Sequence, residues 1–256
     1  MDYSAIGQAV ATSEDLTVER KTTREVPREG VALLRLVDYI ETGRHEAKNP
    51  MHKPSLKVLL TFELSHPDHM IEMDGKKVPA KITVRVNKTY SDKGKYMPLF
   101  KALDRALGGG FKHIVQMIGK PMLGHIYHNE WEGKKFANLD IDGSWSFKPA
   151  TMDDPLSGTS TPIPVPELHG TPKVFLWEAE GMTDEQVTGM WDSIFIEGTR
   201  TNEKGTEVSK NWIQETIMEN IEWEGSTVQA LTQEFVSLDD DGATPAADGT
   251  VPSLDD

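Results

Sequence analysis

The stretch Leu56-Lys-Val-Leu-Leu-Thr-Phe-Glu-Leu64 places an apolar side chain at every second position. These positions are Leu56, Val58, Leu60, Phe62 and Leu64, and between them stand Lys57, Leu59, Thr61 and Glu63. Successive side chains of a strand point to opposite faces of a sheet. The alternation therefore predicts a β-strand that is buried on one face and exposed on the other.

A second strand with the same alternation is predicted at residues 81–87, after a turn signal at Asp74-Gly75. Its apolar positions are Ile82, Val84 and Val86. Two adjacent strands of this kind share one solvent-facing side of the sheet. That side is expected to carry Lys57, Lys81 and Arg85.

A further strand precedes this pair. Residues 31–40 are mostly apolar, and Arg35 and Tyr39 have the same parity, so their polar groups are expected on one face. Residues 42–54 are predicted as a loop, because they hold the turn formers Gly43, Asn49, Pro50 and Pro54.

A helix and a strand pair follow. Leu99, Leu103, Ala106 and Leu107 recur at helical spacing, and Gly108, Gly109 and Gly110 end this helix. A second, short helix is predicted at residues 111–118. Residues 122–130 and 135–147 are predicted to pair as strands around the turn Trp131-Glu-Gly-Lys-Lys135.

The predicted order is three strands, a helix and two strands, which describes a mainly β chain with helices, in the α+β class. It is the element order of the OB-fold, a five-stranded Greek-key barrel. Such barrels bind oligonucleotides on the face of strands two and three and with the loops that join strands 1–2 and 4–5. We therefore predict an OB-fold domain for binding single-stranded DNA at residues 30–147.

Charge is distributed unevenly along the chain, whose formal net charge is −14. Residues 30–147 hold 18 of the 27 Lys and Arg residues against 13 Asp and Glu residues, which gives +5. Residues 1–29 carry −2 and residues 148–256 carry −17. The total charge alone argues against a polyanionic partner, whereas a basic, strand-rich domain favours one.

Four further segments are predicted around this domain. Residues 1–29 lack periodicity and are expected to form a flexible arm, and residues 148–172 are rich in Pro, Ser and Thr, as linkers are. Residues 173–236 are predicted to be a helical accessory region, because Thr183-Asp-Glu-Gln186 fits a capping box and further helical patterns follow around Trp212 and after Ser226. Residues 237–256 hold six Asp and no basic residue, which predicts a disordered acidic tail.

The composition limits the chemistry and the location. The chain has no Cys, which excludes disulfides, thiolate metal sites and thiol nucleophiles. Residues 1–8 lack the basic start and apolar run of a signal peptide, and no apolar run approaches the length of about 20 residues that spans a membrane. A cytoplasmic protein without membrane contact is expected.

Binding of single-stranded nucleic acid requires cations along the phosphates and flat side chains for the bases. Each stacked base contributes about 1–3 kcal/mol with little sequence preference. The candidate DNA-binding residues are the cations and aromatic residues of the predicted strand faces and loops. They are Arg35, Tyr39, Arg44, Lys48, His52, Lys53, Lys57, Lys81, Arg85, Lys88, Tyr90, Lys93, Lys95, Tyr96, Tyr127, Trp131, Lys134, Lys135 and Phe136.

This combination resembles the bacteriophage single-stranded DNA-binding proteins, which join an OB-fold core to a disordered acidic C-terminus. The resemblance rests on residues 30–147 and on the tail from Ser237-Leu-Asp-Asp-Asp241 to Val251-Pro-Ser-Leu-Asp-Asp256. It implies a protein without enzymatic activity or cofactor that coats single-stranded DNA in phage replication or recombination, in the host cytoplasm. It also implies tail contacts with replication and recombination proteins, although this tail lacks the terminal aromatic residue that is frequent in the family.

Two kinds of enzyme site are alternatives to DNA binding. His125 and His128, with His113, could bind a metal, but a spacing of three residues puts the first two on opposite faces of a strand, and no H-E-x-x-H motif is present. Asp140 and Asp142 are expected on one strand face, as in a hydrolase. Nothing in the sequence marks a nucleophile or base beside them.

A function of a different class also stays open. The chain could be a protein–protein adaptor or a virion-associated protein that acts through its helical region at residues 173–236. Tight protein partners and no binding to single strands would identify it. The sequence leaves the oligomeric state open.

Overall fold

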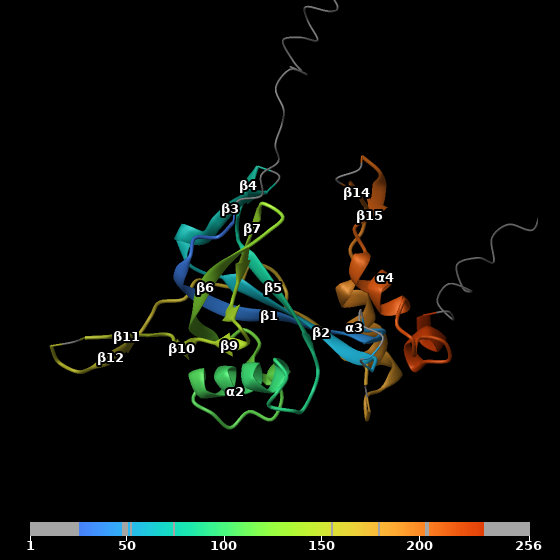
Figure 1. The fold of residues 1–256 in the computed structure, drawn as a ribbon, viewed down its shortest axis with the longest axis horizontal. Coiled ribbons are helices and arrows are strands. Elements are labelled where there is room, and N and C mark those ends of the chain that lie inside the picture. The colour runs from blue at the N-terminus through green and yellow to red at the C-terminus, as the bar shows by residue number, and fades with distance from the viewer. Residues whose placement is uncertain are drawn as a thin grey trace, which may run out of the picture.

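The computed structural model describes residues 26–47, 51, 53–73, 75–154, 156–178, 180–202 and 205–232 (Figure 1). These residues form a mainly β structure with a few helices, which confirms the predicted α+β class. Most of the predicted N-terminal arm and the whole of the predicted acidic tail lie outside the described residues.

Within these residues, the main sheet consists of seven strands. They are β1 (Gly30–His45), β2 (Ser55–Leu64), β5 (Lys81–Asn87), β6 (Pro121–Trp131), β7 (Lys134–Asn138), β10 (Phe147–Pro149) and β13 (Lys173–Phe175). Their hydrogen-bonded path is β10–β6–β1–β2–β5, while β7 pairs with β6 and β13 pairs with β1. The boundaries of β2 and β5 confirm the two strands predicted from alternation.

Short two-stranded pairs extend from this sheet. They are β3 (Met70–Met73) with β4 (Lys76–Pro79), β8 (Asp140–Ile141) with β9 (Ser144–Trp145), β11 (Thr151–Asp153) with β12 (Ser160–Pro162), and β14 (Thr199–Thr201) with β15 (Glu207–Ser209). Single 3₁₀ turns occur at η1 (Pro67–His69) and η2 (Ile114–Met117). The hairpin β11–β12 projects from one side of the molecule, and the hairpin β14–β15 lies on the other (Figure 1).

Strand β1 is the centre of the sheet. One edge pairs with β2, whereas the other pairs first with β6 through residues 30–35 and then with β13 through residues 38–40. Register shifts against β2 follow Leu36 and Glu41. The predicted loop at residues 42–54 was wrong at its start, because residues 42–45 continue β1.

The first hydrophobic core lies between the inner face of this sheet and helix α2 (Tyr96–Ala106). Leu60 and Phe62 of β2 pack there with Leu99 and Leu103, which are all fully buried. The helix ends before three successive glycines with positive φ, as the sequence predicts.

A second core covers part of the opposite face of the sheet. Ile40 and Leu59 pack there against Phe175, Val187 and Ile217 of the C-terminal region. Strand β2 is consequently buried on both faces, because the side that was expected to face solvent lies under this region and the segment before it. The prediction of a half-buried β2 was therefore wrong, whereas β5 alternates between buried and exposed positions as predicted.

The C-terminal helices begin where the sequence predicts them. Helix α3 (Asp184–Ile194) starts with a complete capping box between Thr183 and Gln186, and α4 (Trp212–Met218) follows β15. Ser226 Oγ accepts a hydrogen bond from Gln229 N at the start of a helical turn at residues 227–232. Of the helices in the described residues, none combines the length and the apolar character needed to cross a bilayer.

The predicted last strand, at residues 135–147, is broken into pieces in the structure. It comprises β7, β8, β9 and the start of β10, with a tight turn between β8 and β9 at Asp142 and Gly143, both of which have positive φ. Strand β7 contacts β5, but no hydrogen-bonded ladder joins the two strands in the described residues. A closed barrel is therefore not found.

The predicted linker at residues 148–172 is also partly structured. It contains most of β10 and the hairpin β11–β12, and it continues into a segment at residues 166–177, the strap, which includes β13 and contacts β1 and β2. Glu63 and Asp38 accept hydrogen bonds from the backbone N–H groups of His169 and Lys173, each at 3.1 Å. Glu41 accepts one from Trp177 N at 3.0 Å. Three carboxylates of the sheet thus fix the strap to it.

Gly43 provides a test of how the C-terminal region docks on β1. Its φ is 83°, and a Cβ there would lie 2.5 Å from Cγ of Asn220. We expect Gly43→Ala to lower the free energy of unfolding by about 3 kcal/mol in urea denaturation, through backbone strain and overpacking together.

Gly75→Ala is the matched control, because Gly75 has φ 73° but no atom within 4 Å of the Cβ position. Strain alone should cost it about 1 kcal/mol. Equal losses in the two variants would contradict a close approach of Asn220 to β1.

Candidate nucleic-acid interface

Three of the predicted DNA-binding residues lie in the protein interior. Arg35 is 5% exposed, and its guanidinium bonds Glu63 at 2.8 Å and the carbonyl oxygens of Pro166 and Glu167 in the strap. Tyr39 and Tyr96 are buried with their hydroxyl groups 3.0 Å apart. Because none of the three offers a surface to a phosphate or a base, their predicted role does not fit this structure.

The buried tyrosines belong to a polar network around Glu41, which is fully buried. Its carboxylate accepts hydrogen bonds from the Tyr39 hydroxyl at 2.9 Å and from Lys88 Nζ at 2.7 Å. Burial raises the pKa of Tyr39, and Glu41 and Tyr96 add to this effect. Burial disfavours the charged form of Lys88 and so lowers its pKa. The hydrogen bond with Glu41 and the negative charge of Glu41 have the larger combined effect, and the pKa of Lys88 is therefore raised. Lys88, a predicted DNA contact, thus serves to neutralise an internal carboxylate.

Other predicted cations are exposed but bound to acidic partners. Arg44 pairs with Glu178 at 3.0 Å and with Glu222 at 2.9 Å, both from the C-terminal region. Lys95 Nζ lies 2.7 Å from the buried carboxylate of Asp140. Lys53, Tyr90 and Lys93 are exposed, while Lys48 and His52 lie outside the described residues.

The hairpin of β6 and β7 brings the next group of predicted residues together. In its antiparallel register Trp131 lies opposite Lys134, Asn129 opposite Phe136, and Tyr127 opposite Asn138. Residues directly opposite each other point to the same side of a sheet, so Tyr127, Trp131, Lys134 and Phe136 share one side, whereas Lys135 and Glu130 are on the other. Ile126, the neighbour of Tyr127 on β6, is buried and points to the other side of the strand. The side that carries Tyr127, Trp131, Lys134 and Phe136 therefore faces outward.

We call the outward side of β6 and β7 the hairpin face, with His125, Tyr127, Trp131, Lys134 and Phe136 as its members. Trp131 is 70% exposed and Phe136 is 48% exposed, which is unusual for aromatic side chains of this size. The rings of His125 and Tyr127 lie 4.5 Å apart. The turn at the end of the hairpin has positive φ at both Glu132 and Gly133, which is the geometry that suits a two-residue β-hairpin.

The outward side of β5 adds cations near the hairpin face. Lys81 and Arg85 are exposed there, and β5 contacts β7. Lys57 has the same outward parity, opposite Asn87, but it is only partly exposed beside the covered part of β2. The structure thus brings Lys81, Arg85 and Lys134 onto the outward sides of neighbouring strands.

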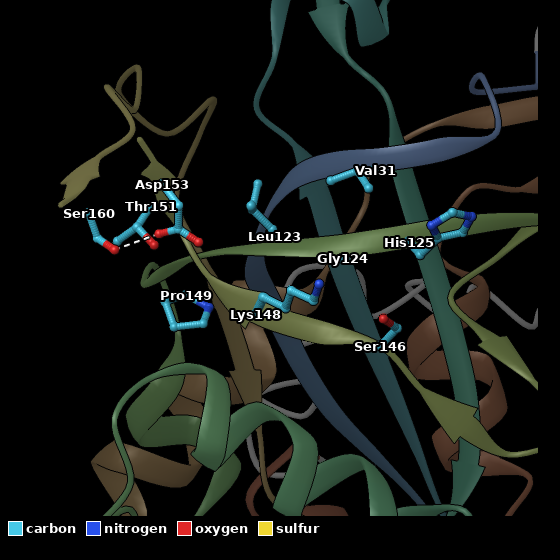
Figure 2. A pocket seen from close by; sticks show the side chains of 10 residues that line it. All are labelled: Val31, Leu123, Gly124, His125, Ser146, Lys148, Pro149, Thr151, Asp153 and Ser160. Atoms are coloured by element: carbon cyan, nitrogen blue, oxygen red, sulfur yellow. Dashed lines mark hydrogen bonds between the residues drawn. The ribbon is translucent and has the colours of Figure 1, made fainter. Parts of the chain in front are cut away.

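A cavity that the sequence analysis missed lies beside the hairpin face (Figure 2). Its volume is about 550 Å³, and its lining includes Leu123 and His125 of β6, Val31 of β1, and Ser146 and Lys148. Lys148 falls in the stretch predicted as a linker. The sequence signal that could have placed it on a strand is the alternation of polar and aromatic residues in Ser144-Trp-Ser-Phe-Lys148.

The structure does not assemble the alternative enzyme sites. His128 Nε2 is 2.8 Å from the carbonyl oxygen of Pro27, away from His125 on the other side of β6. Asp140 is buried, whereas Asp142 lies exposed in the β8–β9 turn. In the part of the chain that the structure describes, no group of three His, Asp or Glu side chains is arranged to hold a metal ion.

The variant Arg35→Ala tests whether a buried cation stabilises the fold. We expect Arg35→Ala to lower the free energy of unfolding by about 3 kcal/mol, because it leaves the Glu63 carboxylate buried without its cation. Urea denaturation measures this, with Lys81→Ala as a control that should change stability by less than about 0.5 kcal/mol. Equal, small effects would mean that Arg35 is accessible at the surface.

Comparisons of this chain with protein-family profiles, curated proteins and solved structures gave no match.

Proposed function

We propose that this protein binds single-stranded DNA with little sequence preference and that the hairpin face is the main contact surface. The observation that carries the proposal is the exposure of Trp131 and Phe136 on one side of a hairpin, together with Lys134. Exposed rings stack on bases of any sequence, and nearby cations neutralise phosphates. A role in phage DNA replication or recombination follows from the resemblance in charge and architecture.

The spacing of the rings suits this function. Side chains two residues apart on a strand point to the same side at a separation of about 7 Å. His125, Tyr127 and Trp131 follow this period along β6, with Phe136 beside them on β7. The rings of His125 and Tyr127 lie 4.5 Å apart and could meet one base together, whereas Trp131 and Phe136 could meet others. Lys81 and Arg85 of β5 supply positive charge at the flank.

The proposal includes a partly open barrel of the OB type. Its support is the order β1, β2, β5, α2, β6 and β7, with antiparallel pairing of β1 to β2, of β2 to β5, of β1 to β6 and of β6 to β7. Contact between β5 and β7 without a ladder corresponds to the open side. Because β2 is covered, the proposed DNA path runs over β6, β7 and β5 rather than over strands two and three.

The acidic segment at residues 238–256 lies outside the described residues. We include it in the proposal as a contact for replication or recombination proteins, on the basis of its charge alone. DNA binding by the hairpin face does not require it.

Fluorescence anisotropy tests the proposal directly. The full-length protein should bind oligo-dT more tightly than a duplex of equal length, because the faces of paired bases are stacked and unavailable. The affinity should fall with salt at a log–log slope of about −0.7 per phosphate contact. Equal binding of the two DNAs, no binding, or a flat salt response would contradict the proposal.

Two phenylalanines of similar exposure provide a matched comparison within this test. Phe136 on the hairpin face is 48% exposed, and Phe195 in the C-terminal region is 53% exposed. Phe136→Ala should cost about 1–3 kcal/mol of binding free energy to oligo-dT, whereas Phe195→Ala should cost nothing measurable. A loss in Phe195→Ala alone would favour the helical region as the interaction surface.

A further inference from the structure

The cavity beside the hairpin face has the size of a small-molecule site. Its volume of about 550 Å³ lies in the range of about 300–1,000 Å³ that is typical of ligand pockets. Figure 2 shows β6 as its floor, with Val31 of β1 on one side, Lys148 of β10 on the other, and the hairpin β11–β12 closing one end. The base of a nucleotide could lie against the apolar side chains of Leu123 on this floor and of Val31 beside it.

The cavity is continuous with the hairpin face through His125. This residue lines the cavity, and its ring lies 4.5 Å from the ring of Tyr127, the next outward-facing residue of β6. Val31 is paired with His125 across β1 and β6 and is 68% exposed, so an exposed apolar side chain stands beside His125 in the cavity. A strand that followed β6 away from Trp131 would enter this cavity.

The polar groups of the cavity are separated by charge. Lys148, Ser146 and His125 lie on the side nearer to the hairpin face, and the Lys148 ammonium group points away from Asp153 (Figure 2). At the other end, the Asp153 carboxylate accepts a hydrogen bond from the Ser160 hydroxyl. A phosphate is therefore attracted to the first side and repelled from the second.

We propose that this cavity binds one nucleotide unit of the single strand, with its phosphate at Lys148 and its base against Val31 and Leu123. The inference rests on the proposed function, because the strand reaches the cavity from the hairpin face. None of the residues that line this cavity is among the candidate DNA-binding residues of the sequence analysis. The projecting hairpin β11–β12 then acts as the end wall of the DNA path.

Removal of the charge and filling of the cavity test the site by independent routes. Lys148→Ala should weaken oligo-dT binding about tenfold, as expected for one lost hydrogen bond between charged groups, and should reduce the steepness of the salt dependence by about 0.7. Lys148→Arg should retain most of the affinity. Ser146→Trp should weaken binding to a similar degree, because the indole occupies the space of the nucleotide.

Matched controls lie outside the cavity. Ser144→Trp introduces the same ring at an exposed position two residues away, and Lys210→Ala removes an exposed lysine from the C-terminal region. Neither should change the affinity for oligo-dT. If Lys148→Ala and Ser146→Trp behave like these controls while Phe136→Ala weakens binding, the cavity inference is overturned and the proposed function stands. If the unmodified protein does not bind oligo-dT, the proposed function fails as well.

Discussion

Hydrogen bonds that three carboxylates of the sheet accept from the backbone of a distant segment determine which surfaces of this protein are free. Glu63, Asp38 and Glu41 accept the N–H groups of His169, Lys173 and Trp177, which lie four residues apart along the strap. The strap and the helices after it cover β2 and the second half of β1. Val31 near the start of β1 and the tip of the β6–β7 hairpin stay exposed, and that is where the rings and the cavity lie.

Burial of Glu63 and Glu41 is tolerated because each carboxylate is compensated. A buried charge is costly unless a partner of opposite charge and further hydrogen bonds satisfy it. Glu63 has the Arg35 guanidinium at 2.8 Å and the His169 N–H, and Glu41 has Lys88 at 2.7 Å together with Tyr39. The same pairing removes Arg35 and Lys88 from the cations available to a ligand. The fold thus uses Arg35 and Lys88 to compensate internal carboxylates and leaves Lys81, Arg85 and Lys148 exposed at the surface.

Local patterns in the sequence predicted local structure well. Strict alternation identified β5 with its boundaries, helical spacing and three glycines identified α2 and its end, and the capping box at Thr183 identified the start of α3. The covering of β2 could not be predicted, because its partners lie more than 100 residues away and alternation reports only that one face is apolar. For the same reason Arg35 looked like a surface residue. Tyr39 was expected on the same face as Arg35, but a register shift after Leu36 lies between them, and Tyr39 packs in the first core beside Tyr96. Trp131 and Phe136 could be placed correctly at the surface, since a two-residue turn holds them at the end of a hairpin.

The central claim is that the outward side of β6 and β7 holds the bases of a single strand. Photo-crosslinking tests it most directly: an oligo-dT with 5-iodo-deoxyuridine is irradiated in complex with the full-length protein, and the attached peptides are identified by mass spectrometry. The account predicts adducts within residues 121–138, at Trp131 and Phe136 above all. Adducts confined to α3 and α4 would contradict it.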